Sequence, residues 1–131
     1  MLSREDVEAF IERLGAEGVT SKEVQPGLWV LTQGTDSSEV AVHYNPPVVV
    51  LRVRVMKLGP NNRKAELYKH LLELNATDLM HGSYGIDGDA VVLSDALELE
   101  NLDFTEFQAS YDSITLALAS HLATLAPYRQ A

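Results

Sequence analysis

Three β-rich runs in the first half of the chain are joined by connections too short to cross over a sheet. The runs span residues 19–33, 39–44 and 48–56, with Pro26-Gly27 interrupting the first. The connecting segments, 34–38 and 45–47, are rich in Gly, Asp, Ser, Asn and Pro, which favour turns. Parallel neighbours would need connections of about a dozen residues. We therefore expect a three-stranded antiparallel meander.

The third run shows how that sheet divides its two faces. Arg52 and Arg54 alternate with apolar residues, which are Val49, Leu51, Val53 and Val55. Side chains alternate between the faces of a strand, so one face is buried and the other meets water.

Helical spacing of apolar residues predicts three helices around this sheet. The first follows Ser3, which can cap it together with Asp6; the second follows residues 59–62; the last follows the capping pair Asp103 and Glu106 and stops at Pro127. Residues 80–87 and 89–98 flank an Asp87-Gly88 turn and predict a hairpin. The expected fold is one α+β domain over residues 1–131, in the order α-β-β-β-α-β-β-α, with helices on one side of an antiparallel sheet.

Composition excludes several classes of function. The 131 residues are 46% hydrophobic, enough for one core. A formal net charge of −9 is the wrong sign for binding a phosphate backbone, and the absence of cysteine excludes disulfides and thiolate chemistry. No basic leader precedes an apolar run, and no apolar stretch approaches the ~20 residues of a membrane span. We expect a cytoplasmic protein that binds no nucleic acid and does not insert into membranes.

Catalytic and metal-binding motifs are weak. The four histidines, His43, His70, His81 and His121, have no ligand spacing typical of zinc, so no metal or cofactor is expected. The segment 81–85 (HGSYG) lacks the glycine two residues before the serine of a nucleophile elbow. Carboxylates crowd residues 95–106 without the spacing of a calcium loop. We expect the chain not to be an enzyme.

Two features point to a protein partner instead. Residues 1–74 carry nine basic and ten acidic side chains, whereas residues 75–131 carry one basic and nine acidic, so the charge distribution is bipolar. Leu28, Trp29, Val30 and Leu31 are adjacent, so a strand there has apolar side chains on both faces. Either a second apolar layer or a partner chain covers the second face. The candidate partner-binding residues are Trp29, Leu31, Arg52 and Arg54.

The segment 74–89 (LNATDLMHGSYGIDGD), followed by 97–103 (LELENLD), resembles the YbjN-domain family of bacterial proteins, which is similar in fold to the type III secretion chaperones. The resemblance implies a cytoplasmic, non-enzymatic α+β protein that dimerises and binds an extended segment of another protein. It also implies a homodimer interface on the second helix and the fourth and fifth predicted strands. The resemblance implies no catalytic residues.

Two other functions stay open. One is a small-molecule-sensing or signalling-regulator domain, with a pocket between the last helix and the sheet in which His121 or Tyr111 orients a ligand. The other is an enzyme that uses His81 with nearby carboxylates. The leading hypothesis is a dimeric chaperone-like or adaptor protein.

Overall fold

The computed structural model describes residues 1–34, 39–60 and 63–129, and most of the predicted turn at 34–38 lies outside them. The helices and strands follow one another as α1 (Arg4–Leu14), η1 (Gly15–Glu17), β1 (Val19–Gln25), β2 (Leu28–Gln33), β3 (Val40–Asn45), β4 (Val48–Lys57), α2 (Lys64–Thr77), β5 (Ser83–Asp87), β6 (Ala90–Glu98), α3 (Phe104–Leu125) and η2 (Ala126–Arg129).

The strands form one antiparallel sheet in the order β1-β2-β3-β4-β6-β5. The predicted α+β class is confirmed, but the expectation of three strands before α2 is wrong, because the first run is two strands. Pro26-Gly27 is the turn of a hairpin rather than an interruption, and Gly27 has a positive φ of 79° that glycine adopts without strain. The element order is therefore α-β-β-β-β-α-β-β-α.

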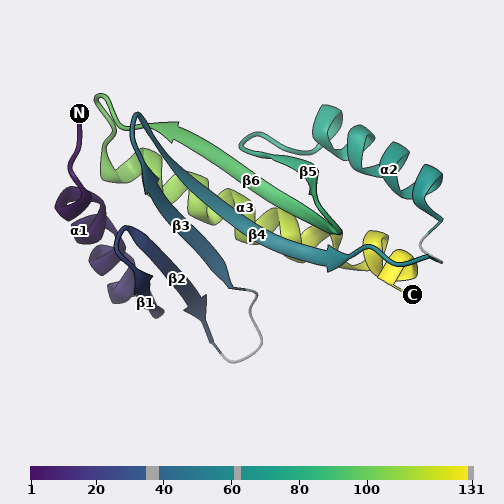
Figure 1. The fold of residues 1–131 in the computed structure, drawn as a ribbon, viewed down its shortest axis with the longest axis horizontal. Coiled ribbons are helices and arrows are strands. Elements are labelled where there is room, and N and C mark those ends of the chain that lie inside the picture. Colours follow the sequence, from purple (N-terminus) through teal and green to yellow (C-terminus); the bar gives the residue numbers. More distant parts are fainter. Residues whose placement is uncertain (35–38, 61–62, 130–131) are drawn as a thin grey trace.

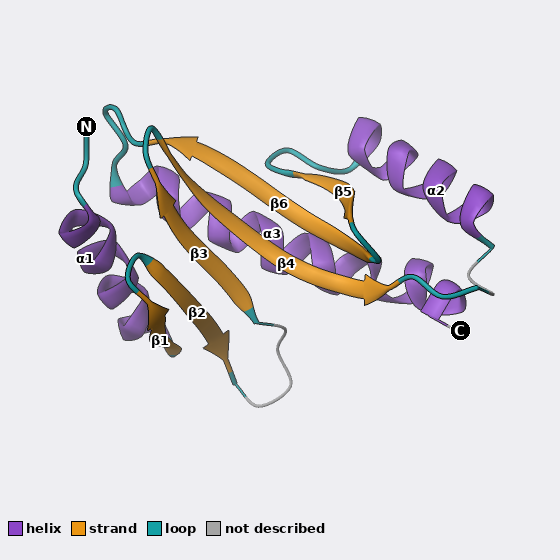
Figure 2. Ribbon diagram, viewed as in Figure 1, coloured by secondary structure: helices purple, strands orange, loops and turns teal. Residues whose placement is uncertain are grey.

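The helices α1 and α3 pack against one face of the sheet, as expected. In Figure 1 the strands β4 and β6 pass in front of α3, and Figure 2 shows α2 beyond β5, at the opposite end of the sheet from β1. Phe107 and Ile114 of α3, Leu51 of β4 and Leu93 of β6 are fully buried in one core. Burial of such large side chains is the main stabilising contribution to folding.

Both predicted capping pairs are confirmed. Ser3 and Asp6 form a capping box at the start of α1, and Asp103 and Glu106 form another at the start of α3. In each box the side chains satisfy backbone N–H groups that the first helical turn leaves unpaired. A backbone hydrogen bond of 3.3 Å from Leu2 to Leu99 holds the chain just before α1 against the end of β6.

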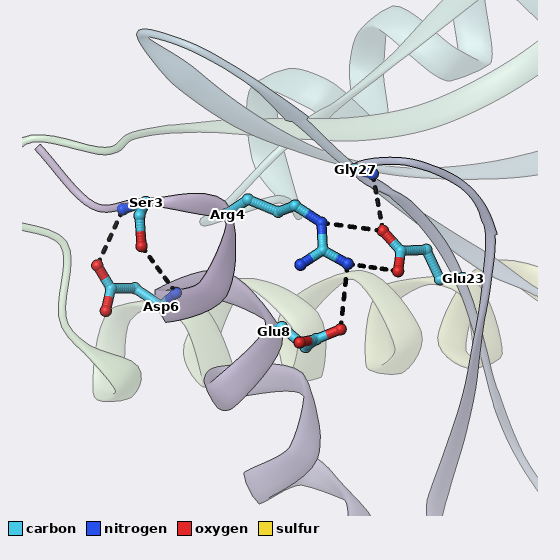
Figure 3. Close-up of polar contacts among 6 residues, drawn as sticks. All are labelled: Ser3, Arg4, Asp6, Glu8, Glu23 and Gly27. Carbon is cyan, nitrogen blue, oxygen red and sulfur yellow. Dashed lines mark hydrogen bonds and ion pairs between the residues drawn. The ribbon is translucent and has the colours of Figure 1, made fainter.

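An ionic cluster holds α1 against the β1–β2 hairpin (Figure 3). Arg4 of α1 contacts both carboxylate oxygens of Glu23 on β1, one of them at 3.0 Å, and it also contacts Glu8 at 3.2 Å. The Arg4 hydrogen bond, followed by that from the Gly27 backbone N–H, lowers the pKa of Glu23. Arg4 also lies 5.3 Å from the centre of the Trp29 ring, a cation–π contact that covers this side chain.

Candidate functional site

The face of the sheet opposite α3 carries the two candidate arginines. Arg52 and Arg54 of β4 are exposed. Leu51, which precedes Arg52, and Val53, which lies between the two arginines, are fully buried. Strand pairing sets Arg52 opposite Ala41 on one side and Ser94 on the other. We call this face the open face and define it by Val30, Ala41, Arg52, Arg54, Ala90 and Val92.

Acidic side chains of the β5–β6 turn contact the basic side chains of β4. Arg52 lies 3.2 Å from a carboxylate oxygen of Asp87, Arg54 lies 3.9 Å from Asp89, and Lys57 lies 4.0 Å from the other oxygen of Asp89. All five side chains are about half exposed or more. Ion pairs this exposed are screened by water and contribute little to stability.

The open face is hollowed around these ion pairs. A groove of about 590 Å³ is lined by the six open-face residues together with Glu39, Asp87 and Asp89. A second hollow of about 330 Å³ shares Val30 and Glu39 with the first and reaches Lys22 and Val24 of β1. The two hollows therefore adjoin one another across the sheet, from β6 to the edge strand β1.

The structure corrects the placement of Trp29 and Leu31. They are 2% and 0% exposed and lie in the core between the sheet and the helices, so they do not share a face with Arg52 and Arg54. The alternate residues of β2, Leu28 and Val30, are half-buried on the other face. The adjacency of four apolar residues indicated two apolar faces, but only strand register shows which pair is buried. A role for Arg52 and Arg54 in binding a partner stays a prediction.

The two edges of the sheet differ in how accessible their backbones are. At β5 the side-chain amide of Asn75 donates a 3.2 Å hydrogen bond to the Tyr84 carbonyl and accepts one of 2.7 Å from the Tyr84 backbone N–H. Asn75 therefore occupies backbone groups that a neighbouring strand would use. At β1 every described residue after Val19 is exposed, and β1 pairs with β2 alone among the described strands. This edge is the more accessible of the two.

A buried polar cluster joins β5 to α3. The Tyr84 hydroxyl lies 2.7 Å from Nδ1 of His121, and Nε2 of the same ring lies 3.3 Å from a carboxylate oxygen of Asp78. Burial, followed by the nearby Asp78 charge, raises the pKa of Tyr84 to about 12. Both nitrogens of the His121 ring therefore contact side chains of the fold, Tyr84 and Asp78, so the ring has a structural role.

The pocket expected between the last helix and the sheet is not found in the described part of the chain. Phe107, Tyr111 and Ile114 of α3 are 2% exposed or less and fill that interface. A depression of about 420 Å³ lies instead between α3 and the segment that precedes β5, and His81 and His121 are among the residues that line it. The side chain of His81 is exposed, and no carboxylate of the described residues forms a hydrogen bond or ion pair with it.

Neither a membrane-spanning helix nor a metal-ligand cluster occurs among the described residues. No helix within them is both long enough and apolar enough to span a bilayer. Likewise, the described side chains include no group of three or more His, Asp or Glu that could hold a metal ion.

Comparison with known proteins identifies relatives of this fold. The model of the CesT_Tir_1 family matches residues 2–131. No curated protein matches the chain. Several solved structures match the chain.

One chain in the structure of the heterodimeric ExoU–SpcU complex from the type III secretion system of Pseudomonas aeruginosa has a TM-score of 0.70 at 12% identity, with 92% of this chain and 98% of that chain covered. YbjN, described as a putative transcription regulator from E. coli, has a TM-score of 0.65 at 12% identity and coverages of 95% and 96%. The Yersinia pestis type III secretion chaperone SycH, in complex with a stable fragment of YscM2, has a TM-score of 0.61 at 21% identity and coverages of 93% and 98%. At sequence identities this low, the structural similarity shows a shared fold alone.

Proposed function

The chain belongs to the CesT_Tir_1 family, and from that premise we propose that it is a cytoplasmic chaperone-like or adaptor protein that binds an extended segment of a partner protein. The family and the chaperones that share its fold are non-enzymatic, in agreement with the expectation from the sequence. The similar structures include complexes of such chaperones with other proteins, among them SycH with a YscM2 fragment. The single observation that carries the proposal is the accessible edge at β1 beside a hollowed open face.

The edge at β1 fits an extended segment for a physical reason. A peptide added to a sheet edge pairs its backbone with the edge strand, and side-chain pockets beside that strand supply selectivity. Val24 of β1 is 47% exposed and lines the smaller hollow, which opens onto the groove with Arg52 and Arg54. A segment paired with β1 would therefore lie beside the smaller hollow, and the chain that continues from it could cross the open face toward β4.

The proposal includes a homodimer that uses α2 and the hairpin of β5 and β6, which are the fourth and fifth predicted strands. Tyr68 and Leu72, one helical turn apart on α2, are 36% and 67% exposed, and Ile86 of β5 is 47% exposed. Apolar side chains at this exposure are favourable to bury against a second copy. Because Asn75 occupies the backbone of β5 at Tyr84, the two copies would meet through side chains at that point rather than through strand pairing.

Purification of the native protein from its source, followed by mass spectrometry of bound polypeptides, tests the partner. We expect a defined polypeptide with the unaltered protein, its loss with Val24→Glu, and its retention with Leu122→Glu, a matched change at a leucine of α3 that is 50% exposed. A purified protein that carries a small molecule and no polypeptide would contradict the proposal and favour the ligand-sensing alternative.

Light scattering tests the dimer separately. We expect the mass of two chains for the unaltered protein and for Leu122→Glu, and the mass of one chain for Leu72→Glu. A single-chain mass for the unaltered protein at micromolar concentration would remove the homodimer from the proposal and leave partner binding to the purification experiment.

A further inference from the structure

We propose that the open face binds an acidic extended segment of a partner, whose carboxylates replace those of Asp87 and Asp89 on Arg52 and Arg54. This inference rests on the proposed function and names the chemistry of the partner. Its physical basis is the spacing of the two arginines, the two acids that now contact them and the groove around all four, which Glu39 also lines.

The spacing of the arginines suits alternate residues of an extended chain. Arg52 and Arg54 are two residues apart on β4, which sets their Cα atoms about 6.8 Å apart on one face. In an extended peptide the side chains of residues i and i+2 also lie on one face at that spacing. Two acidic residues separated by one residue can therefore meet both guanidinium groups at once.

The β5–β6 turn already places two acids on these arginines, although its backbone is a tight turn at Gly88 rather than an extended chain. Asp87 and Asp89 flank Gly88 in the β5–β6 turn, with the spacing of an Asp-x-Asp motif, and they contact Arg52 and Arg54 respectively. The turn thus occupies the two arginines in the way that we propose for the partner. It also keeps the positive charge of β4 neutralised when no partner is bound.

These internal contacts are weak enough to be replaced. The Arg52–Asp87 and Arg54–Asp89 contacts measure 3.2 and 3.9 Å, and the four side chains are between 46% and 67% exposed. A carboxylate held by both ends of a guanidinium group makes shorter and stronger hydrogen bonds than such a contact. A partner segment that offers two freely oriented carboxylates gains this geometry, which the turn does not provide.

The lining of the groove also limits which side chains of the partner segment can lie beside its acidic residues. Between the charged residues its lining is apolar and mostly small, from Val30, Ala41, Ala90 and Val92, and its volume is about 590 Å³. Small aliphatic side chains of the partner can be buried there next to the ion pairs. The preferred segment is therefore acidic at alternate positions and aliphatic near them.

Fluorescence anisotropy with two labelled synthetic peptides tests this inference. One alternates glutamate and valine, and the other alternates lysine and valine. We expect the glutamate peptide to bind the unaltered protein more tightly than the lysine peptide does. Arg52→Gln with Arg54→Gln should raise the dissociation constant of the glutamate peptide at least tenfold, whereas Lys64→Gln with Lys69→Gln, which removes the same charge from α2, should leave it within about twofold.

The paired change Asp87→Asn with Asp89→Asn gives the decisive result. If these acids compete with the partner, their removal lowers the dissociation constant of the glutamate peptide several-fold. If the groove binds basic segments instead, the same change weakens the lysine peptide and the inference is wrong. Equal binding of both peptides by all variants also overturns it. Circular dichroism of each variant confirms that the fold is retained.

The outcome for the native partner separates this inference from the proposed function. A native polypeptide that the double arginine variant retains but Val24→Glu loses would leave the proposed function standing and remove the groove from it. A protein that carries no polypeptide would contradict the proposed function, and the peptide measurements would still decide what the groove prefers.

Discussion

Asn75 hydrogen-bonds through its side-chain amide to both backbone polar groups of Tyr84, at 2.7 and 3.2 Å, and so takes the place of a neighbouring strand at the β5 edge. Unpaired strand edges are sites of aggregation and of pairing with other chains. The amide restricts such pairing at β5, whereas β1 at the other edge is accessible. Under the proposed function, an extended segment would therefore pair at β1 rather than at β5.

Replacement of Asn75 tests that relationship. Asn75→Ala removes two hydrogen bonds and leaves the Tyr84 backbone groups without these partners, so we expect the free energy of unfolding to fall by about 2 kcal/mol. Urea denaturation measures the loss. Thr77→Ala is the control, because the Thr77 hydroxyl hydrogen-bonds to Glu73, one helical turn earlier, and to the adjacent Asp78, and not to β5. Equal stability of the two variants would show that the amide pairing is unimportant.

Two glycines near β5 form a matched pair for substitution. Gly82 immediately precedes the strand, and Gly85 lies within it. Gly82 has a φ of 80°, and a Cβ atom there would lie 2.8 Å from the Ser94 carbonyl oxygen, whereas a Cβ at Gly85 would meet nothing within 4 Å. We expect Gly82→Ala to destabilise the protein by about 1–3 kcal/mol through backbone strain, and Gly85→Ala to have little effect. Thermal denaturation of both variants checks this, and a Gly82→Ala protein as stable as the parent would contradict the described path of the chain.

Tyr84 predicts a dependence of stability on alkaline pH. Its pKa is about 12 in the folded protein against 10.0 for an ordinary tyrosine. Between these values the unfolded chain loses this proton and the folded chain retains it, so the stability associated with Tyr84 is present below pH 10 and is lost as the pH rises toward 12. Tyr84→Phe should therefore lose less stability over this range than the unaltered protein.

Urea midpoints measured from pH 9 to pH 12 test that prediction. Tyr68→Phe is the matched control, because Tyr68 is a tyrosine of α2 that is 36% exposed rather than buried. Parallel curves for the unaltered protein and Tyr84→Phe would show that burial of the phenol has no such effect.

Trp29 tests the corrected division of faces. It is the single tryptophan of the chain and is 2% exposed, so its fluorescence should be typical of a buried indole and shift to longer wavelength on unfolding. We expect Trp29→Ala to cost about 3–5 kcal/mol, because it leaves a cavity in the core. Val30→Ala, on the open face, should cost much less. A long-wavelength emission from the folded protein would instead favour an exposed Trp29.

Local patterns predicted much of the fold because the interactions behind them are local. The capping pairs Ser3–Asp6 and Asp103–Glu106 involve residues three apart, and the alternation of Arg52 and Arg54 with buried neighbours follows from strand geometry. The hairpin at Asp87-Gly88 is likewise a short-range signal. The turn at Pro26-Gly27 is just as local, but Pro-Gly within a β-rich run fits an interruption of one strand as well as a hairpin turn, so the expected strand count before α2 is too low.

The candidate site depended on more than local pattern. Four adjacent apolar residues, 28–31, show that both faces of β2 are apolar, but the pairing of β2 with β3 and of β3 with β4 decides that Trp29 faces the helices and Val30 shares a face with Arg52. The pairing of Asn75 with Tyr84 joins residues nine apart across a helix end and a loop, and no spacing rule indicates it.

The sequence by itself therefore determined the α+β class, the starts of α1 and α3 and the exposure of Arg52 and Arg54, since these depend on hydrogen bonds and side-chain alternation within a few residues. Only the tertiary structure decided which apolar residues are buried, which sheet edge is accessible and that Asp87 and Asp89 contact the arginines. These relationships depend on strand register and helix packing, which are set by the summed burial of side chains far apart in the chain.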